Sequence, residues 1–202
     1  IDIQPLNKQT INFLSWFSKY NLIPLGMALK LHLLSGNAVD RQNKNEYQKY
    51  QVIDEKEQFN LSKEQENALK EIITNINSFR VHLLQGTTGS GKTIVYFNVI
   101  KKIIEEEKQC LILLPEIGLT GEFEKKFKKF FGFEAAVWHS KITPKKKKII
   151  WSGLANGEIK VVIGARSALF LPFKQLGLII VDEEHDQSYK QDEGIIYNAR
   201  DM

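Results

Sequence analysis

The chain has 202 residues, of which 43% are hydrophobic and 26% are charged. This composition excludes a disordered protein, and the length suits one α/β domain with an appendage. The net charge of +4 permits nucleic-acid binding without requiring it, and a single cysteine, Cys110, excludes an internal disulfide or a cysteine-rich zinc site within these residues. No signal peptide or apolar run of about 20 residues is present, so we expect no membrane contact and a cytoplasmic location.

Apolar periodicity predicts helices over residues 6–35, interrupted at Pro24 and Gly26. We expect the aromatic side chains of this segment to lie in the core rather than on a DNA-stacking surface. They are Phe13, Trp16, Phe17 and Tyr20. Residues 36–60 are polar and poor in aliphatic side chains, which is typical of a linker or a weak helix.

A helix is predicted to begin at Ser62, because Ser62-Lys63-Glu64-Gln65 fits a capping box. In this pattern the serine side chain accepts from the Gln65 amide, and the Gln65 side chain accepts from the Ser62 amide. The capping pattern alone is a sufficient reason for a glutamine at this position.

The string GTTGSGKT at 86–93 fits the phosphate-binding loop G-x-x-x-x-G-K-[ST]. We expect a β-strand over 81–85 before it and a helix over 94–104 after it, so that free amides at the helix start face an anion. Lys92 is placed to reach the β- and γ-phosphates, and the Thr93 hydroxyl to bind Mg²⁺. The predicted ATP-binding residues of the loop are Gly86, Thr87, Thr88, Gly89, Ser90, Gly91, Lys92 and Thr93.

Two further helices have clear sequence signals. One is predicted from a cap at Thr120 to a stop at Gly132, with phenylalanines forming its inner stripe. The other begins at Thr143-Pro144, a cap followed by proline at the first helical position. Its first turn holds four lysines, 145–148, which either meet a phosphate or form a solvated face.

The apolar run 178–181 predicts a strand buried on both faces of a parallel sheet. Asp182 and Glu183 follow it directly, at the sheet edge where open α/β sheets bind ligands. We expect Asp182 to hold Mg²⁺ and Glu183 to orient and deprotonate the attacking water.

GTTGSGKT together with DEEH (182–185) resembles superfamily 2 helicases of the DExH type. Three longer blocks are similar to the replication-restart helicases of the PriA family. They are LLPEIGLT (113–120), GARSALFLPF (164–173) and VDEEHDQSYKQDEGIIYNARD (181–201).

The resemblance implies a RecA-like phosphate-loop fold, a parallel sheet flanked by helices, with a small N-terminal helical segment. In this arrangement 1–35 ends an N-terminal DNA-binding region, 36–60 is a linker without the family's winged helix, and 61–202 is an incomplete first helicase lobe. The second lobe, and the strand usually found between the phosphate-loop strand and the DEEH strand, would follow residue 202. We therefore expect a gap in the sheet, weak nucleotide binding and little turnover by these residues alone.

The implied activity is that of an ATP-driven 3′→5′ DNA helicase that acts at stalled forks and assembles the primosome. Lys92, Asp182 and Glu183 would be catalytic, with ATP and Mg²⁺ as cofactors, and Gln65 would read adenine. DNA binding or its coupling to hydrolysis would involve Arg166, Ser167, His185, Tyr189, Lys190 and Tyr197. The family usually has an aromatic near position 196, where this chain has Ile196.

The implied partners are branched and single-stranded DNA, primosome proteins and single-strand-binding protein, and zinc is expected only beyond residue 202. Three alternatives stay open at this point. They are a different superfamily 2 translocase, a phosphate-loop kinase, and a nucleotide-binding docking module with little turnover.

Overall fold

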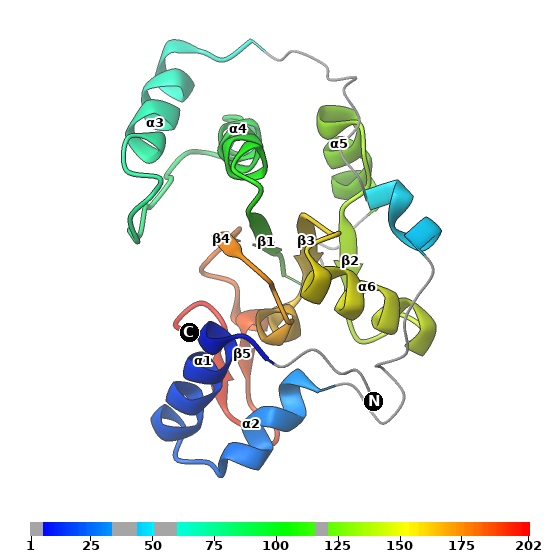
Figure 1. The fold of residues 1–202 in the computed structure, drawn as a ribbon. Helices are drawn as coiled ribbons and strands as arrows, with labels where there is room; N and C mark the ends of the chain where they lie inside the picture. The colour runs from blue at the N-terminus through cyan, green and yellow to red at the C-terminus, as the bar shows by residue number, and fades with distance from the viewer. Residues whose placement is uncertain (1–5, 34–43, 51–59, 116–120) are drawn as a thin grey trace.

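The computed structural model describes residues 6–33, 44–50, 60–115 and 121–202 (Figure 1). The predicted cap at Thr120, the end of the LLPEIGLT block and most of the predicted linker lie outside these residues. The part of the linker that is described, Lys44–Tyr50, forms the 3₁₀ helix η1. Two of its tyrosines, Tyr47 and Tyr50, are buried in the core.

The centre of the fold is a parallel sheet of four strands in the order β2-β3-β1-β4. The strands are β1 (Gln109–Leu113), β2 (Ala136–Trp138), β3 (Val161–Gly164) and β4 (Leu176–Val181). In register, Leu111 of β1 lies opposite Val162 of β3 and Ile179 of β4. Helices separate consecutive strands, as parallel connections require. The predicted α/β fold with a parallel sheet is therefore confirmed.

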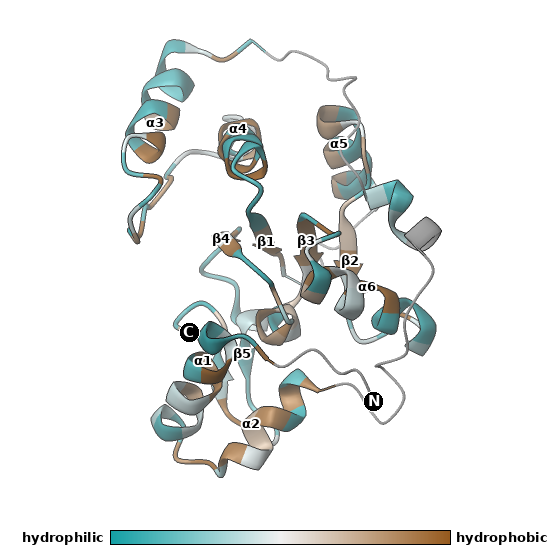
Figure 2. Cartoon of the chain, in the orientation of Figure 1, coloured by the Kyte–Doolittle hydropathy of each residue, from teal (hydrophilic) through white to brown (hydrophobic). Residues whose placement is uncertain are grey.

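One face of the sheet is covered by α4 (Lys92–Glu105) and α5 (Gly121–Phe131), with α3 (Lys63–Ile73) beside α4 (Figure 1). Figure 2 shows brown and teal on different sides of α4 and α5, the amphipathic pattern that packs a helix on a sheet. The fully buried Phe97 ring of α4 contacts four phenylalanines of α5. The predicted phenylalanine stripe is thus the inner face of α5, and Gly132, with φ of 77°, follows the helix.

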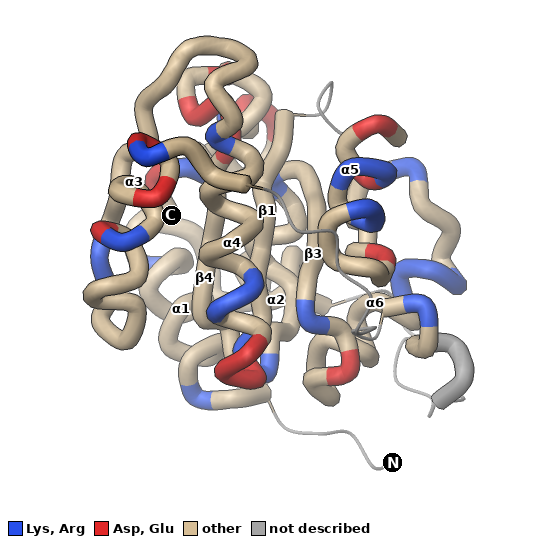
Figure 3. Tube along the Cα trace, turned by 90° about the horizontal axis from the view of Figure 1, so that it is seen from above, with Lys and Arg blue, Asp and Glu red and all other residues tan. Residues whose placement is uncertain are grey.

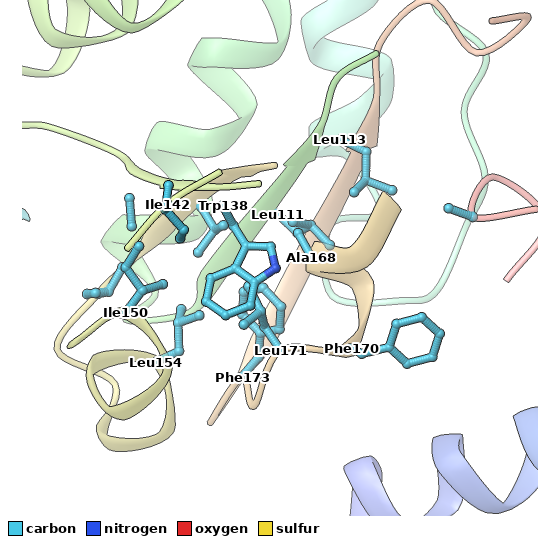
Figure 4. Close-up of a cluster of buried hydrophobic side chains, with 14 of the residues drawn as sticks. Leu111, Leu113, Trp138, Ile142, Ile150, Leu154, Ala168, Phe170, Leu171 and Phe173 are labelled. Carbon is cyan, nitrogen blue, oxygen red and sulfur yellow. The ribbon is translucent and has the colours of Figure 1, made fainter. Parts of the chain in front are cut away.

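The opposite face is covered by α6 (Pro144–Asn156), the 3₁₀ helix η3 (Arg166–Phe170) and the N-terminal pair α1 (Lys8–Tyr20) and α2 (Leu25–His32). Figure 4 shows part of this layer, with Trp138 and Leu111 of the sheet among side chains from α6 and η3. The Trp151 ring of α6 donates to the His32 carbonyl at 3.1 Å, and the His32 Nδ1 bonds the Phe170 carbonyl at 2.7 Å. These contacts join α2 to both α6 and η3.

The N-terminal aromatics divide into two kinds. Phe17 is fully buried against Phe170 and Tyr197, and Phe13 is partly buried, as expected. Trp16 and Tyr20 are 43% and 61% exposed and stack on each other at 5.1 Å between ring centroids. The core prediction was wrong for these two, because α1 packs on the protein through only one of its faces.

The strand predicted over 81–85 does not form. Residues 79–87 form neither helix nor strand, and their apolar side chains are exposed, among them Val81 and Leu83. The expected burial of β4 on both faces is also wrong, since Ile179 is 45% exposed. Both differences have one cause: β4 ends the sheet, and the described residues include no strand between it and the 81–85 segment. The described sheet therefore has no gap at its centre; it ends at β4.

The predicted helix starts at Ser62 and Thr143 are confirmed by their caps. Ser62 and Gln65 form both bonds of the capping box, at 3.3 Å and 2.9 Å. The Thr143 hydroxyl accepts from the Lys146 amide at 3.3 Å, and Pro144 occupies the first turn of α6. Figure 3 shows lysines gathered along α5 and beside α6. Across the described residues, no helix has both the length and the apolar character needed to cross a bilayer.

Two short strands, β5 (Lys190–Gln191) and β6 (Tyr197–Asn198), pair in antiparallel fashion after the acidic DEEH turn. They are linked to the sheet by a turn and the 3₁₀ helix η4 (Gln187–Tyr189). This hairpin lies beside α1 in Figure 1, so the C-terminal segment contacts the N-terminal helices.

Candidate ATP site and the loop beside it

The phosphate loop forms a tight curl between residues 79–85 and α4. Gly89 and Gly91 adopt φ angles of 82° and 83°, in the left-handed region that favours glycine. A Cβ atom at Gly86 would lie 2.6 Å from the Ser90 hydroxyl oxygen, so the Ser90 side chain would have to move for a larger residue. Gly91 is the N-cap of α4, and the free amides of this helix start point at the site. This backbone suits a phosphate group.

The Lys92 side chain folds back over the loop. Its Nζ donates to the carbonyl of Gly86 at 2.7 Å and to that of Thr87 at 3.3 Å. The ammonium group therefore lies within the curl of the loop, where it would donate hydrogen bonds to a bound phosphate. Thr93 follows on the first turn of α4, which is the predicted place for a hydroxyl ligand of Mg²⁺.

Gln65 connects α3 to the phosphate loop. Its Nε2 donates to the Ser90 carbonyl at 2.9 Å, while its Oε1 accepts from the Ser62 amide at 2.9 Å. A Cβ atom at Gly91 would lie 2.4 Å from the Gln65 Nε2. Both polar atoms of the side chain are thus engaged within the protein, one as a cap and one as a tie to the loop. Reading of adenine by Gln65 stays a prediction.

Asp182 and Glu183 leave the carboxyl end of β4. The Asp182 amide donates to the Leu113 carbonyl at 3.0 Å, which continues the β1–β4 pairing by one residue. The Glu183 amide then donates to the Asp182 Oδ1 at 3.0 Å. Glu183 has a φ of 47°, a conformation that costs a side-chain-bearing residue about 1–3 kcal/mol and that recurs at functional sites.

The phosphate-loop helix and the acidic strand end are joined by Tyr96. Its hydroxyl donates to the Asp182 Oδ2 at 2.9 Å. Burial, together with the nearby Asp182 carboxylate, raises the pKa of Tyr96 far above its usual range, so the hydroxyl keeps its proton. The two motifs, separated by about 90 residues, therefore meet at one place.

The donor set at this place fits a nucleotide with Mg²⁺. A nucleotide-bound Mg²⁺ takes one or two protein oxygens, with phosphates and water completing its shell. Thr93 and Asp182 would hold the ion, and it would neutralise charge on the phosphates. Among the described residues, no group of three or more His, Cys, Asp or Glu is gathered as a ligand cluster.

Tyr189 connects the following loop to the same strand ends. The side chain is 1% exposed, and its hydroxyl bonds the carbonyls of Leu113, at 3.0 Å, and of Asp182. Leu113 ends β1 and Asp182 follows β4, so this one side chain contacts both strands at the ATP site. A change in the position of η4 would therefore move the hydroxyl of Tyr189 and displace the carbonyl of Asp182 that it bonds.

Arg166 holds the same loop from η3. Its guanidinium donates to the carbonyls of Ser188 and Lys190 at 2.9 Å and 3.0 Å, and to the Gln191 side chain at 3.2 Å. Tyr197 is also internal, with its ring edge-on to Phe170 at 5.4 Å, and burial raises the pKa of its hydroxyl to about 12. The structure therefore buries Tyr189 and Tyr197, while Arg166, which is partly exposed, holds the loop from η3.

Other predicted residues are exposed. Ser167 lies on the outside of η3, and Lys190 pairs with Asp192 at 2.9 Å. His185 is within 3.7 Å of the Glu183 carboxylate, with both side chains more than half exposed. Ile196 is 62% exposed.

Sequence reasoning missed Tyr96 as part of the site. The apolar spacing of the helix drew attention to its neighbours at 95, 99 and 100, and a tyrosine in that run looked like another core residue. The available signal was its position three residues after Thr93, on the same side of the helix.

Comparisons with known proteins agree with this geometry. A family model described as "Type III restriction enzyme, res subunit" matches residues 58–201. The chain belongs to this family. The matched range contains the phosphate loop, the acidic strand end and the loop that follows it.

Curated relatives carry the name "Replication restart protein PriA". The protein from Rickettsia felis is 43% identical over 97% of this chain and 29% of its own length. The Helicobacter pylori (strain J99) protein is 50% identical over 70% of this chain and 22% of its own length. The Bacillus subtilis protein is 42% identical over 70% and 18%. The resemblance to PriA is thus confirmed, and the chain spans about three tenths of these relatives at most.

A solved structure also matches. It is titled "Structure of RecG bound to three-way DNA junction", and it aligns with a TM-score of 0.58 and 32% sequence identity. The match covers 70% of this chain and 20% of that one. It supports the RecA-like interpretation of the sheet and its helices.

Proposed function

We propose that this chain carries the ATP-binding lobe of a 3′→5′ DNA helicase that acts at stalled replication forks and restarts replication. Lys92 and the loop amides would bind the β- and γ-phosphates. Asp182 would hold Mg²⁺ with Thr93, and Glu183 would orient and deprotonate the attacking water.

The observation that carries the proposal is the meeting of the two motifs. The Tyr96–Asp182 bond places the phosphate loop and the acidic strand end at one site, in a chain 43% identical to a replication restart protein. A chance match to the loop pattern would not bring a carboxylate to the same helix. A kinase is disfavoured because the relatives that match this chain are named replication restart proteins.

The packed loop supports coupling of ATP hydrolysis to DNA. DNA contact at Ser167 or Lys190 would move η3 or the 188–191 loop, which Arg166 holds together. Tyr189 would pass the displacement to the carbonyl of Asp182. In this interpretation Tyr189 and Tyr197 act through packing rather than by stacking on bases.

The partners proposed are branched and single-stranded DNA, with primosome and single-strand-binding proteins, in the cytoplasm. DNA is supported by the relatives' role in replication restart and by the junction in the RecG structure. ATP and Mg²⁺ are the cofactors of these residues, and a zinc module would lie outside them.

The deciding experiment is DNA-stimulated ATPase of the full-length gene product, with Glu183→Gln as the matched control. We expect the wild type to hydrolyse ATP faster on forked DNA with a free 3′ end, and Glu183→Gln to bind ATP without turnover. Calorimetry with ATP and Mg²⁺, comparing wild type with Lys92→Ala, tests the binding step. Nucleotide binding without any DNA-stimulated turnover would favour a docking module instead.

A further inference from the structure

Tyr96 lies between the helix that follows the phosphate loop and the acidic strand end. It is on α4, three residues after Thr93, so the two side chains share one face of the helix. The side chain is 7% exposed, and its ring lies edge-on to Phe97 at 5.4 Å. The hydroxyl reaches the Oδ2 of Asp182 at 2.9 Å. Among the described residues, it is the one side chain bonded to that carboxylate.

The other groups of Asp182 are held by backbone or by Tyr189. Its amide bonds the Leu113 carbonyl, its Oδ1 accepts from the Glu183 amide, and its carbonyl accepts from Tyr189. The sheet fixes the backbone of Asp182, and the Glu183 amide holds one of its carboxylate oxygens, Oδ1, which leaves Oδ2 for a side-chain partner. The last torsion of an aspartate side chain has a broad distribution, so a partner on Oδ2 decides how the two oxygens face the site.

We propose that Tyr96 is a positioning residue, whose hydroxyl orients the Asp182 carboxylate for the Mg²⁺–nucleotide. The proposal rests on the proposed ATP-binding function. Outer partners of this type fix the orientation of a metal ligand without touching the metal, and their loss weakens metal affinity by about 10–100-fold. Because Tyr96 and Thr93 are on one helix face, α4 would set both protein oxygens of the metal site at once.

A second consequence concerns motion of the helix. Residues 92–96 carry the Lys92 ammonium, which would bind the phosphates, at one end and the Tyr96 hydroxyl at the other. A shift of α4 on nucleotide binding would therefore be passed to Asp182 through a hydrogen bond, in addition to any contact through the metal. The Tyr96–Asp182 hydrogen bond would thus couple phosphate binding at Lys92 to the orientation of the Asp182 carboxylate.

The test is Tyr96→Phe in the full-length gene product, since phenylalanine keeps the ring and removes one oxygen. The probe is mant-labelled ADP, with its binding followed during a MgCl₂ titration and repeated in excess EDTA. We expect the Mg²⁺ concentration for half-maximal binding to rise about tenfold. Binding in EDTA stays unchanged, and Tm falls by no more than about 4 °C, as for the loss of one hydroxyl that bonds Asp182 and Thr93.

Two further variants make the result decisive. Tyr50→Phe removes the hydroxyl of another buried tyrosine, in η1, and should leave the Mg²⁺ titration as in the wild type. In an Asp182→Asn background, Tyr96→Phe should change the Mg²⁺ requirement less than about twofold, because the partner it positions is already altered.

The outcomes separate the two proposals. An unchanged Mg²⁺ titration in Tyr96→Phe overturns the positioning role and leaves ATP binding intact. The same is true if Tyr96→Phe has its full effect in the Asp182→Asn background. If wild type and Lys92→Ala bind mant-ADP equally, the proposed function fails and the positioning role fails with it.

Discussion

Strands β1 and β4 are neighbours with similar apolar sequences and very different surroundings. Every residue of β1, QCLIL, is buried, whereas no residue of β4, LGLIIV, is. In register, the fully buried Leu111 lies beside Ile179, which is 45% exposed. The difference arises because β1 has a strand on each side and β4 has one. Apolar character predicts that a strand forms, but the number of its neighbours decides how much it contributes to stability.

The largest expected effect on stability comes from truncating the side chains of Leu111 and Ile179, which lie beside each other in register. Leu111→Ala should lower the free energy of unfolding by about 2–5 kcal/mol, because it leaves a cavity between the sheet and its helices. Ile179→Ala should cost less than about 1 kcal/mol, since that side chain already contacts solvent. Urea denaturation of both variants measures the contrast, and equal costs would refute it.

The next effect concerns Gln109, a buried polar residue at the start of β1. Its Nε2 donates to the carbonyls of Leu154 and Ile159, and its Oε1 accepts from the Gln175 amide at 2.9 Å. Gln109→Leu keeps the volume but leaves these groups unpaired, which should cost about 3 kcal/mol. Gln175→Leu, which keeps its backbone amide, is the control in the same denaturation series and should change stability little.

A smaller effect is expected at the junction of the two strands. Tyr189→Phe removes the hydroxyl that bonds the carbonyls of Leu113 and Asp182, at a cost of about 1–2 kcal/mol. Amide hydrogen exchange should show the loss at the carboxyl ends of β1 and β4, with β2 and β3 unchanged. Uniform loss of protection over all four strands would mean that Tyr189 stabilises the core rather than the junction.

The smallest effect on stability is expected at the free edge itself. Ile179→Lys should change the free energy of unfolding by less than about 0.5 kcal/mol, while reducing self-association of the 202-residue chain, because charged residues discourage edge-to-edge pairing. Light scattering against protein concentration checks this. Stronger association of the lysine variant would show that the β4 edge is not the contact surface.

Much of the site could be predicted from residues close together in sequence. The phosphate loop, the helix after it and the Ser62–Gln65 capping box all depend on neighbours a few positions apart, and the structure contains each of them. The stop at Gly132 and the start at Thr143 are local for the same reason. By contrast, a strand at 81–85 needs a hydrogen-bonded partner strand from a distant part of the chain. The apolar sequence of this segment was therefore not enough to predict that it forms a strand.

The loop after DEEH shows a second limit. Its tyrosines were expected to serve DNA binding or its coupling, and the sequence does not say whether an aromatic side chain points in or out. The structure buries Tyr189 and Tyr197 and leaves Ile196 exposed. Arg166, some 22 residues earlier, holds the loop by its backbone carbonyls. Carbonyl acceptors are present at every residue, so no sequence pattern marks them.

The sequence by itself determined the chemistry available to this protein, because a lysine in a glycine-rich curl and two carboxylates after an apolar run have few other uses together. It also determined the helices, whose caps and stripes are local. Only the tertiary structure decided that β4 is an edge, that Gln65 ties a helix to the phosphate loop, and that Tyr96 bonds Asp182 across 86 positions. Those outcomes depend on which distant segments meet, and a hydrogen bond between them has no signal in either segment alone.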